Sequence, residues 1–131
     1  MSEKNTQNLS PEQVRDKILS ILEDNKGQDI QCLDVTGLTA IADYMVVVSG
    51  TSSRHVKALA SHVIDEMRDL GIRAQGSEGE DDGEWLLLDF GDSIVHVMQH
   101  STREFYDLES LWQSSFRQAE ELRNLERAEP Q

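Results

Sequence analysis

Hydrophobic residues recur along this chain at two spacings, and each change of spacing marks a new element. From Ser10 to Gly27 the apolar side chains fall three or four positions apart, as on one face of a helix. Ser10, Pro11 and Gln13 have the order of a capping box with proline at the first helical position, and Lys26-Gly27 is typical of a helix end. The pattern predicts a first amphipathic helix, whose buried face contains Val14, Ile18, Ile21 and Leu22.

The next two elements are predicted to be strands. Residues 29–38 alternate apolar and polar positions irregularly, which favours a strand of mixed burial. Residues 43–49 include the continuous apolar run MVVV at 45–48. A β-branched run of this kind is typical of a strand that is covered on both faces.

A second helix is predicted from Ser52, because the apolar positions return to helical spacing as far as Leu70. Gly71 follows at the place where helices commonly end in the left-handed conformation. Residues 72–74 then look like a short strand, and GSEGEDDGE at residues 76–84 is expected to be an acidic loop. The buried face of the helix is expected to contain Val56, Leu59, Ala60, Val63, Met67 and Leu70.

The sequence EWLLLDFGDSIVHVMQ, at residues 84–99, predicts a β-hairpin with a two-residue turn at Gly91-Asp92. One face of this hairpin is apolar throughout and is expected to cover the core, whereas the other mixes polar, aromatic and aliphatic side chains and is a candidate binding surface. The sequence leaves equally open that Trp85 and His96 are partly buried, with their polar atoms bonded internally. The opposed pairs on the mixed face are Trp85 with Met98, Leu87 with His96, and Asp89 with Ile94.

A last helix is expected to start at Ser101-Thr102, either of which can cap it, with Phe105, Leu108, Leu111 and Trp112 on one side. The apolar pattern fades toward the end of the chain, so the final residues are expected to fray. The expected organisation is a flexible N-terminus at residues 1–9, one domain at residues 10–115, and a polar, partly frayed helical extension at residues 116–131.

Composition and net charge indicate the size of the domain and the kinds of molecule that it can bind. With 131 residues and 37% hydrophobic content, the chain fits one domain with a modest core. The net charge of −13 disfavours nucleic acid and anionic membranes as direct partners, so neither membrane association nor sequence-specific nucleic-acid binding is expected. The same charge suits a basic protein partner, or only keeps the chain soluble. The start of the chain lacks signal-peptide features, and a cytoplasmic protein is expected.

The sequence VVVSGTSSRH, at residues 46–55, raises the question of phosphate binding. A P-loop needs a second glycine followed by lysine, and this stretch has one glycine and no lysine. We interpret it as a strand-to-helix turn in which Thr51 or Ser52 caps the helix. The alternative is a nucleotide-binding or nucleotidyltransferase-type enzyme that uses the SGTSS turn. That class needs metal-binding acids on neighbouring strands, and residues 85–90 offer only Asp89.

Other arrangements of reactive side chains are equally weak. His55 and His62 are seven residues apart on the second helix, too far to share a metal ion without further ligands. Cys32 lies among apolar strand residues and resembles a small hydrophobic residue more than a nucleophile. Asp89 and Asp92 flank a turn, where carboxylates usually accept local backbone hydrogen bonds. We therefore expect no catalysis, no cofactor and no metal site.

Two long stretches resemble one known family. KGQDIQCLDVTGLTAIADYMVVVSGTSSRHVKALASHV at residues 26–63 and GEWLLLDFGDSIVHVMQHSTREFYDLESLW at residues 83–112 are similar to the bacterial ribosomal silencing factors, also called Iojap-related proteins. The resemblance implies one small α/β domain, a mixed sheet with helices packed on it, related in fold to nucleotidyltransferases but without their catalytic acids. It also implies binding to the large ribosomal subunit through ribosomal protein number fourteen, which blocks joining of the small subunit and represses translation under nutrient limitation.

The resemblance also suggests which side chains meet the partner. Residues that match the family's recognition surface are Trp85, Asp89, His96, Tyr106 and Glu109. We add Asp92 for its charge beside Asp89, and Met98 because it pairs with Trp85 in the expected hairpin. Aromatic residues are expected to hold the partner and acidic residues to steer it. Family members also form dimers, so a homodimer is a further expectation.

Overall fold

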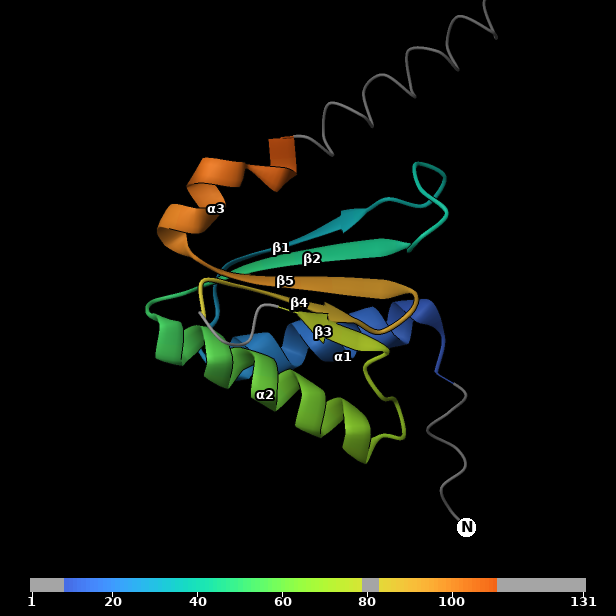
Figure 1. Cartoon of the computed structure of the whole chain (residues 1–131). Helices are drawn as coiled ribbons and strands as arrows, with labels where there is room; N and C mark the ends of the chain where they lie inside the picture. The colour runs from blue at the N-terminus through green and yellow to red at the C-terminus, as the bar shows by residue number, and fades with distance from the viewer. Residues whose placement is uncertain (1–8, 79–82, 111–131) are drawn as a thin grey trace, which may run out of the picture.

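A computed structural model describes residues 9–78 and 83–110 of the chain. Its elements are, in chain order, α1 (Pro11–Asp24), β1 (Gln28–Asp34), β2 (Tyr44–Gly50), α2 (Ser53–Asp69), β3 (Gly76–Glu78), β4 (Trp85–Asp89), β5 (Ser93–Gln99) and α3 (His100–Tyr106). Figure 1 shows α1 and α2 under one face of the sheet, with α3 beyond the opposite face at one end. None of the helices in the described residues is long and apolar enough to span a membrane.

The five strands are arranged in the order β1-β2-β5-β4-β3, which confirms the predicted α/β domain with a mixed sheet. β2 and β5 run parallel at the centre, and the other neighbours are antiparallel. β2 is buried along its whole length, as its apolar run predicts. Its Val46 and Val48 side chains belong to the core between the sheet and the helices α1 and α2, whereas Met45 and Val47 face the other side of the sheet.

Local signals place both long helices correctly. Ser10 and Gln13 form the predicted capping box, because the Ser10 side chain accepts from the Gln13 backbone N–H and the Gln13 side chain accepts from the Ser10 N–H. Gly71 ends α2 with φ +85 and donates to the Arg68 carbonyl oxygen, while the next N–H reaches back to the Met67 carbonyl oxygen. This pairing is the Schellman motif that a terminal glycine permits.

The β4–β5 hairpin has the register that the sequence predicts. Its turn is Gly91-Asp92, with Gly91 at φ +89 and the Phe90 N–H bonded to the Ser93 carbonyl oxygen. All three predicted opposed pairs on the mixed face are present. The apolar face of the hairpin packs on α1 and α2 and consists of Leu86, Leu88, Phe90, Val95 and Val97.

Some predictions about elements are wrong. Residues 72–74 are not a strand, because Ile72 is still bonded to the end of α2. Residues 76–78, predicted as the start of the acidic loop, are the strand β3 instead, because Gly76 can pair with Asp89 of β4. Ser101 and Thr102 do not cap the last helix but lie inside it, because β5 continues directly into α3 with Gln99 at the capping position. Residues 79–82 of the predicted acidic loop, and everything from 111 onward, lie outside the described residues.

Candidate functional site

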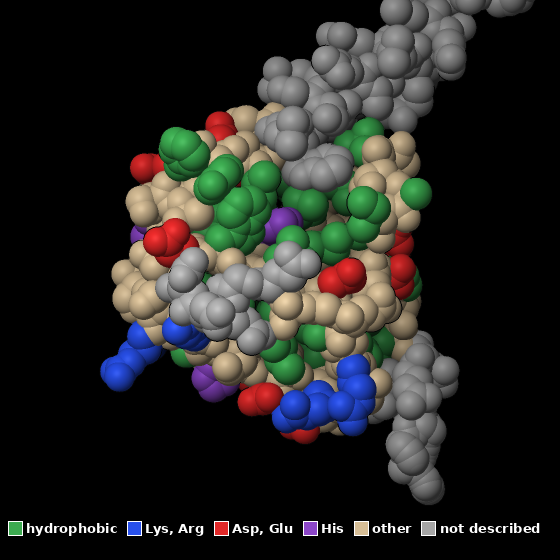
Figure 2. Space-filling view, in the orientation of Figure 1, with side chains coloured by type: hydrophobic (Ala, Val, Ile, Leu, Met, Phe, Trp, Pro, Cys, Tyr) green, Lys and Arg blue, Asp and Glu red, His purple; other side chains and the backbone are tan. Residues whose placement is uncertain are grey.

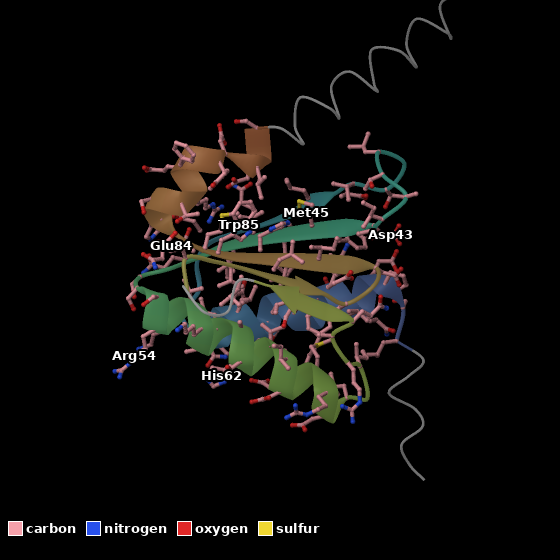
Figure 3. The ribbon with its side chains drawn as sticks, viewed as in Figure 1. Asp43, Met45, Arg54, His62, Glu84 and Trp85 are labelled. Carbon is pink, nitrogen blue, oxygen red and sulfur yellow. The ribbon has the colours of Figure 1, made fainter. Side chains whose placement is uncertain are left out.

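The candidate site lies on the sheet face opposite α1 and α2, where Trp85 at the start of β4 projects toward α3 (Figure 3). The alternation of side chains along β4 and β5 places Trp85 and His96 on this face and the apolar hairpin residues on the other. α3 follows β5 without a loop, so the helix is held close to the strand end that carries Trp85.

Three aromatic side chains, here called the aromatic cluster, meet at this end of the sheet: Trp85, Phe105 and Tyr106. The Tyr106 ring lies 4.8 Å from the Trp85 ring, and the Phe105 ring lies 5.0 Å from that of Tyr106, nearly edge-on. Phe105 is 80% exposed and Tyr106 is 52% exposed. Figure 2 shows hydrophobic side chains gathered over the half of the molecule that α3 occupies. A contiguous exposed patch of this kind usually marks an interaction surface.

Trp85 and His96 are hydrogen-bonded to each other. The indole Nε1–H of Trp85 donates to Nδ1 of His96 at 3.0 Å, so Nδ1 carries no proton and the neutral ring has its proton on Nε2. Burial lowers the pKa of His96 to about 4, so the imidazole is uncharged at neutral pH. Of the two arrangements that the sequence left open, the internal bond is present. His96 thus supports the position of the Trp85 ring.

The other predicted hairpin residues are placed differently. Oδ1 of Asp89 accepts the Gly91 N–H at 2.8 Å, the local bond that turn carboxylates usually make. Asp92 is exposed at the turn. Asp89 is four residues from Trp85 along β4, about 13 Å at the usual rise of a strand, so the acids and the aromatic cluster occupy opposite ends of the hairpin. Met98 has no exposed surface and lies beneath the site.

Glu109 belongs to a largely buried group of three side chains, here called the Arg103 node: Ser49, Arg103 and Glu109. Nε and Nη2 of Arg103 lie 2.7 and 2.6 Å from Oε2 of Glu109, and Nη1 donates to Oγ of Ser49 at 2.8 Å. The side chains of Arg103 and Glu109 are 10% and 17% exposed. Glu109 is therefore committed to Arg103 and is not a free surface charge.

Sequence reasoning missed two residues of this region. Phe105 was expected on the shared apolar side of a longer helix, but α3 ends at Tyr106 and Asp107 takes a left-handed conformation with φ +50. The Phe105 ring consequently remains in solvent. Arg103 carried no signal in the sequence, because its acceptor Ser49 is 54 residues away. An arginine within a polar stretch is indistinguishable from an ordinary surface cation.

The SGTSS turn is occupied by bonds within the fold. Ser52 caps α2 by accepting the His55 N–H, which decides between the two predicted caps. Nδ1 of His55 accepts the Thr51 N–H at 2.9 Å, and Nε2 lies 3.2 Å from the Asn25 carbonyl oxygen. Gly50 allows close packing, because a Cβ there would lie 2.8 Å from Val56. The turn joins β2, α2 and the end of α1, as expected of a capped strand-to-helix turn.

Reactive side chains elsewhere in the described residues do not form a larger group. No three His, Cys, Asp or Glu side chains come together as metal ligands within residues 9–78 and 83–110. Cys32 is partly buried, and this burial raises the pKa of its thiol. The thiol therefore stays protonated and weakly reactive at neutral pH.

The comparisons with known proteins agree on one family. The family model described as "Ribosomal silencing factor during starvation" matches residues 8–131. The ribosomal silencing factor RsfS of Chromobacterium violaceum is 47% identical over 94 residues, which cover 72% of this chain and 77% of that protein. The RsfS protein of Haemophilus influenzae is 42% identical over 95 residues, covering 72% of this chain and 93% of that protein.

The fold agrees as well. A crystal structure of a Chromobacterium violaceum protein superimposes with a TM-score of 0.78 at 42% identity, covering 79% of this chain and 87% of that one. The family model spans almost the whole chain, including the aromatic cluster, the Arg103 node and the SGTSS turn. The chain is a member of the ribosomal silencing factor family, whose members regulate translation at the ribosome without catalysing a reaction.

Proposed function

We propose that this protein binds the large ribosomal subunit through ribosomal protein number fourteen, blocks joining of the small subunit, and so represses translation when nutrients are limited. The observation that carries this proposal is the aromatic cluster, where Phe105 and Tyr106 stay in solvent beside Trp85. Interface energy is concentrated in such aromatic anchors once a partner covers them. Membership of the silencing factor family supplies the class of partner.

Charge and shape near the cluster suit a basic partner. A hollow of about 290 Å³ next to the aromatic cluster is lined by Glu84, Gln99, Ser101, Thr102, Phe105 and Tyr106. The aliphatic stem of a lysine or arginine can pack on the Phe105 and Tyr106 rings while its cationic end reaches the Glu84 carboxylate. The net charge of −13 favours the approach of such a partner over longer distances.

The candidate residues have different roles in this proposal. Trp85 and Tyr106 contact the partner, and His96 and Met98 support Trp85 from within the sheet. Asp89 and Asp92 steer the encounter from the far end of the hairpin. Glu109 contributes through Arg103, because its carboxylate is already paired.

Other parts of the proposal rest on the family resemblance. We infer that the domain is related to nucleotidyltransferases without retaining their catalytic acids, that residues 10–115 form the silencing domain, and that the protein acts in the cytoplasm. The mixed face is also a reasonable contact for a homodimer, which would compete with the ribosomal partner for the same residues. A nucleotide at the SGTSS turn is disfavoured, since the Thr51 N–H that would meet a phosphate is bonded to His55.

The proposal is tested by sedimentation and by subunit joining. The protein should co-migrate with purified large subunits and not with small ones, and should reduce formation of joined ribosomes. Tyr106→Ala should weaken binding to large subunits about tenfold or more, since truncation of an aromatic anchor at an interface costs about 1.4 kcal/mol or more. Ile41→Ala is the matched control, because Ile41 is also an exposed hydrophobic residue, at 73%, but lies outside the aromatic cluster.

Equal binding to joined ribosomes, or joining that proceeds undisturbed, would contradict the mechanism. Calorimetry with ATP, GTP and CTP in the presence of magnesium addresses the alternative enzyme. Micromolar affinity that is lost in Ser52→Ala would favour the nucleotide-binding function instead.

A further inference from the structure

The placement of α3 depends on one buried cation. Within α3, all of whose residues are described, Arg103 is the one buried side chain. A helix of seven residues is too short to be stable by itself, and no side chain caps its start. Phe105 and Tyr106 are largely in solvent and supply little burial. Besides an exposed bond between Nε2 of His100 and Oε1 of Gln28 at 2.8 Å, the bonds of Arg103 are therefore the buried side-chain attachment of α3 to the rest of the fold.

The Arg103 node joins three segments of the chain. Ser49 lies at the carboxyl end of β2 and is fully buried, so its hydroxyl is a fixed acceptor for Nη1 of Arg103. Asp107 turns the chain with its left-handed backbone, and this turn brings Glu109 back to Nε and Nη2 of Arg103. The guanidinium thus fixes α3 to the sheet on one side and to the following turn on the other.

This attachment has a direct geometric consequence for the aromatic cluster. Tyr106 follows Arg103 by three residues, so the two side chains occupy neighbouring positions on α3. With Arg103 held at Ser49, Tyr106 is held 4.8 Å from the Trp85 ring. If α3 were free to shift, Tyr106 and Trp85 would have to be ordered when the partner arrives. Ordering a surface before binding removes that entropic cost.

We propose that Arg103 is a positioning residue for partner capture, which fixes α3 on β2 so that Tyr106 stands against Trp85 before the ribosomal partner binds. This inference rests on the proposed function for its partner, but the ring contact itself exists in the free protein. Ser49, the first polar residue of the SGTSS turn region, then has a role at the binding face. Ser49 holds Arg103 at β2, and Arg103 in turn holds α3 and its Tyr106 beside Trp85.

The central experiment compares three variants with a matched control. Arg103→Met removes the charge and the donors but keeps the length of the side chain, and Ser49→Ala removes only the acceptor on β2. Arg54→Met is the control, because Arg54 is exposed on α2, on the opposite side of the sheet from Trp85 (Figure 3). Arg103→Lys keeps the charge but loses the forked geometry that reaches both partners.

The first measurement is made on the free protein. Nuclear Overhauser contacts between the Tyr106 ring and the Trp85 indole should be strong in the native protein and in Arg54→Met. They should be lost or sharply reduced in Arg103→Met, and partly reduced in Ser49→Ala and Arg103→Lys. Unchanged ring contacts in a folded Arg103→Met protein would overturn the inference. If Arg103→Met fails to fold, Ser49→Ala must show the reduction, and unchanged contacts there overturn the inference equally.

The second measurement is the release rate from purified large subunits. Arg103→Met should speed release about tenfold, similar to Tyr106→Ala, with a nearly unchanged association rate. The double variant Arg103→Met/Tyr106→Ala should release no more than about twofold faster than Tyr106→Ala alone, because Arg103 acts through Tyr106. Effects that multiply would overturn the positioning role. Failure of the native protein to bind large subunits would instead overturn the proposed function, while the ring contacts still report on Arg103.

Discussion

Replacing Glu109 by glutamine should destabilise this protein strongly, although Glu109 is a charged residue near the end of the described chain. The substitution keeps the shape of the side chain and one acceptor oxygen, but removes the charge opposite Arg103. Both side chains are mostly withdrawn from water, at 10% and 17% exposure, and the guanidinium lies 2.6 Å from the carboxylate. A mostly buried arginine would then lack its counter-charge.

The size of the effect follows from that burial. Removing one partner of a fully buried ion pair costs about 3–5 kcal/mol, and the residual exposure and retained acceptor lower the expected cost here to about 2 kcal/mol. For a domain of this size, about 2 kcal/mol lowers the melting temperature by roughly 10 °C. The exposed pair Arg15 and Asp16 provides the control, with a similar distance of 2.9 Å and an Asp16 side chain 65% exposed. Asp16→Asn should cost less than about 0.5 kcal/mol.

Urea unfolding followed by circular dichroism measures both variants under the same conditions. A cost below about 0.5 kcal/mol for Glu109→Gln, equal to that of Asp16→Asn, would show that the pair with Arg103 contributes no more than an exposed ion pair. Glu109 would then behave as an ordinary surface acid and would return to the steering role that the sequence suggested. Association rates across a salt series would distinguish that role, since steering charges are screened over about 8 Å at physiological ionic strength.

Three further predictions concern the hairpin and its support. Burial lowers the pKa of His96 to about 4, so on acidification the imidazole is protonated first in the unfolded chain, and the free energy of unfolding should fall as the pH drops from about 6.5 to about 4. Unfolding measured at each pH should show a fall of up to about 3 kcal/mol relative to a His96→Gln variant. An equal slope in both proteins would contradict this prediction. Asp89→Asn should slow association with large subunits at low salt and leave release nearly unchanged, the reverse of Tyr106→Ala, and a salt-independent association rate in the native protein would remove Asp89 from any steering role. Gly83→Ala should lower the melting temperature, because Gly83 has φ +70 and a Cβ there would lie 2.8 Å from Ser53. Gly76→Ala is the control and should be close to neutral, since a Cβ there would meet nothing within 4 Å. Equal melting temperatures of the two variants would show that the chain relaxes around the new methyl group.

Several features of the fold could be predicted because their causes lie within a few residues of each other. The capping box of α1, the left-handed Gly71 and the register of the β4–β5 hairpin each depend on a short stretch of chain. The same hairpin register placed Trp85 and His96 on the face away from the main core. Their assignment as partner contacts stays a prediction.

Two of the wrong predictions show where such local reasoning ends. Residues 72–74 begin with the β-branched Ile72, but Ile72 is bonded to the end of α2 and β3 pairs with β4 only from Gly76. Ser101 and Thr102 are good capping residues, but the continuous passage from β5 into α3 puts both inside the helix. In the first case a hydrogen bond to α2 outweighed the local preference, and in the second the position of the strand end decided where the helix begins.

The residue pattern is sufficient to predict the α/β class, the two long helices, the hairpin and, through the resemblance, the family. Which acid is a surface charge and which is a structural partner becomes visible only in the folded protein. In the sequence both Glu109 and Asp92 are acids with no sign of a bonding partner, yet Glu109 is paired with Arg103 and Asp92 is exposed at a turn. The physical reason is distance along the chain: the bond from Arg103 to Ser49 spans 54 residues, and only the folded sheet and α3 bring these groups together.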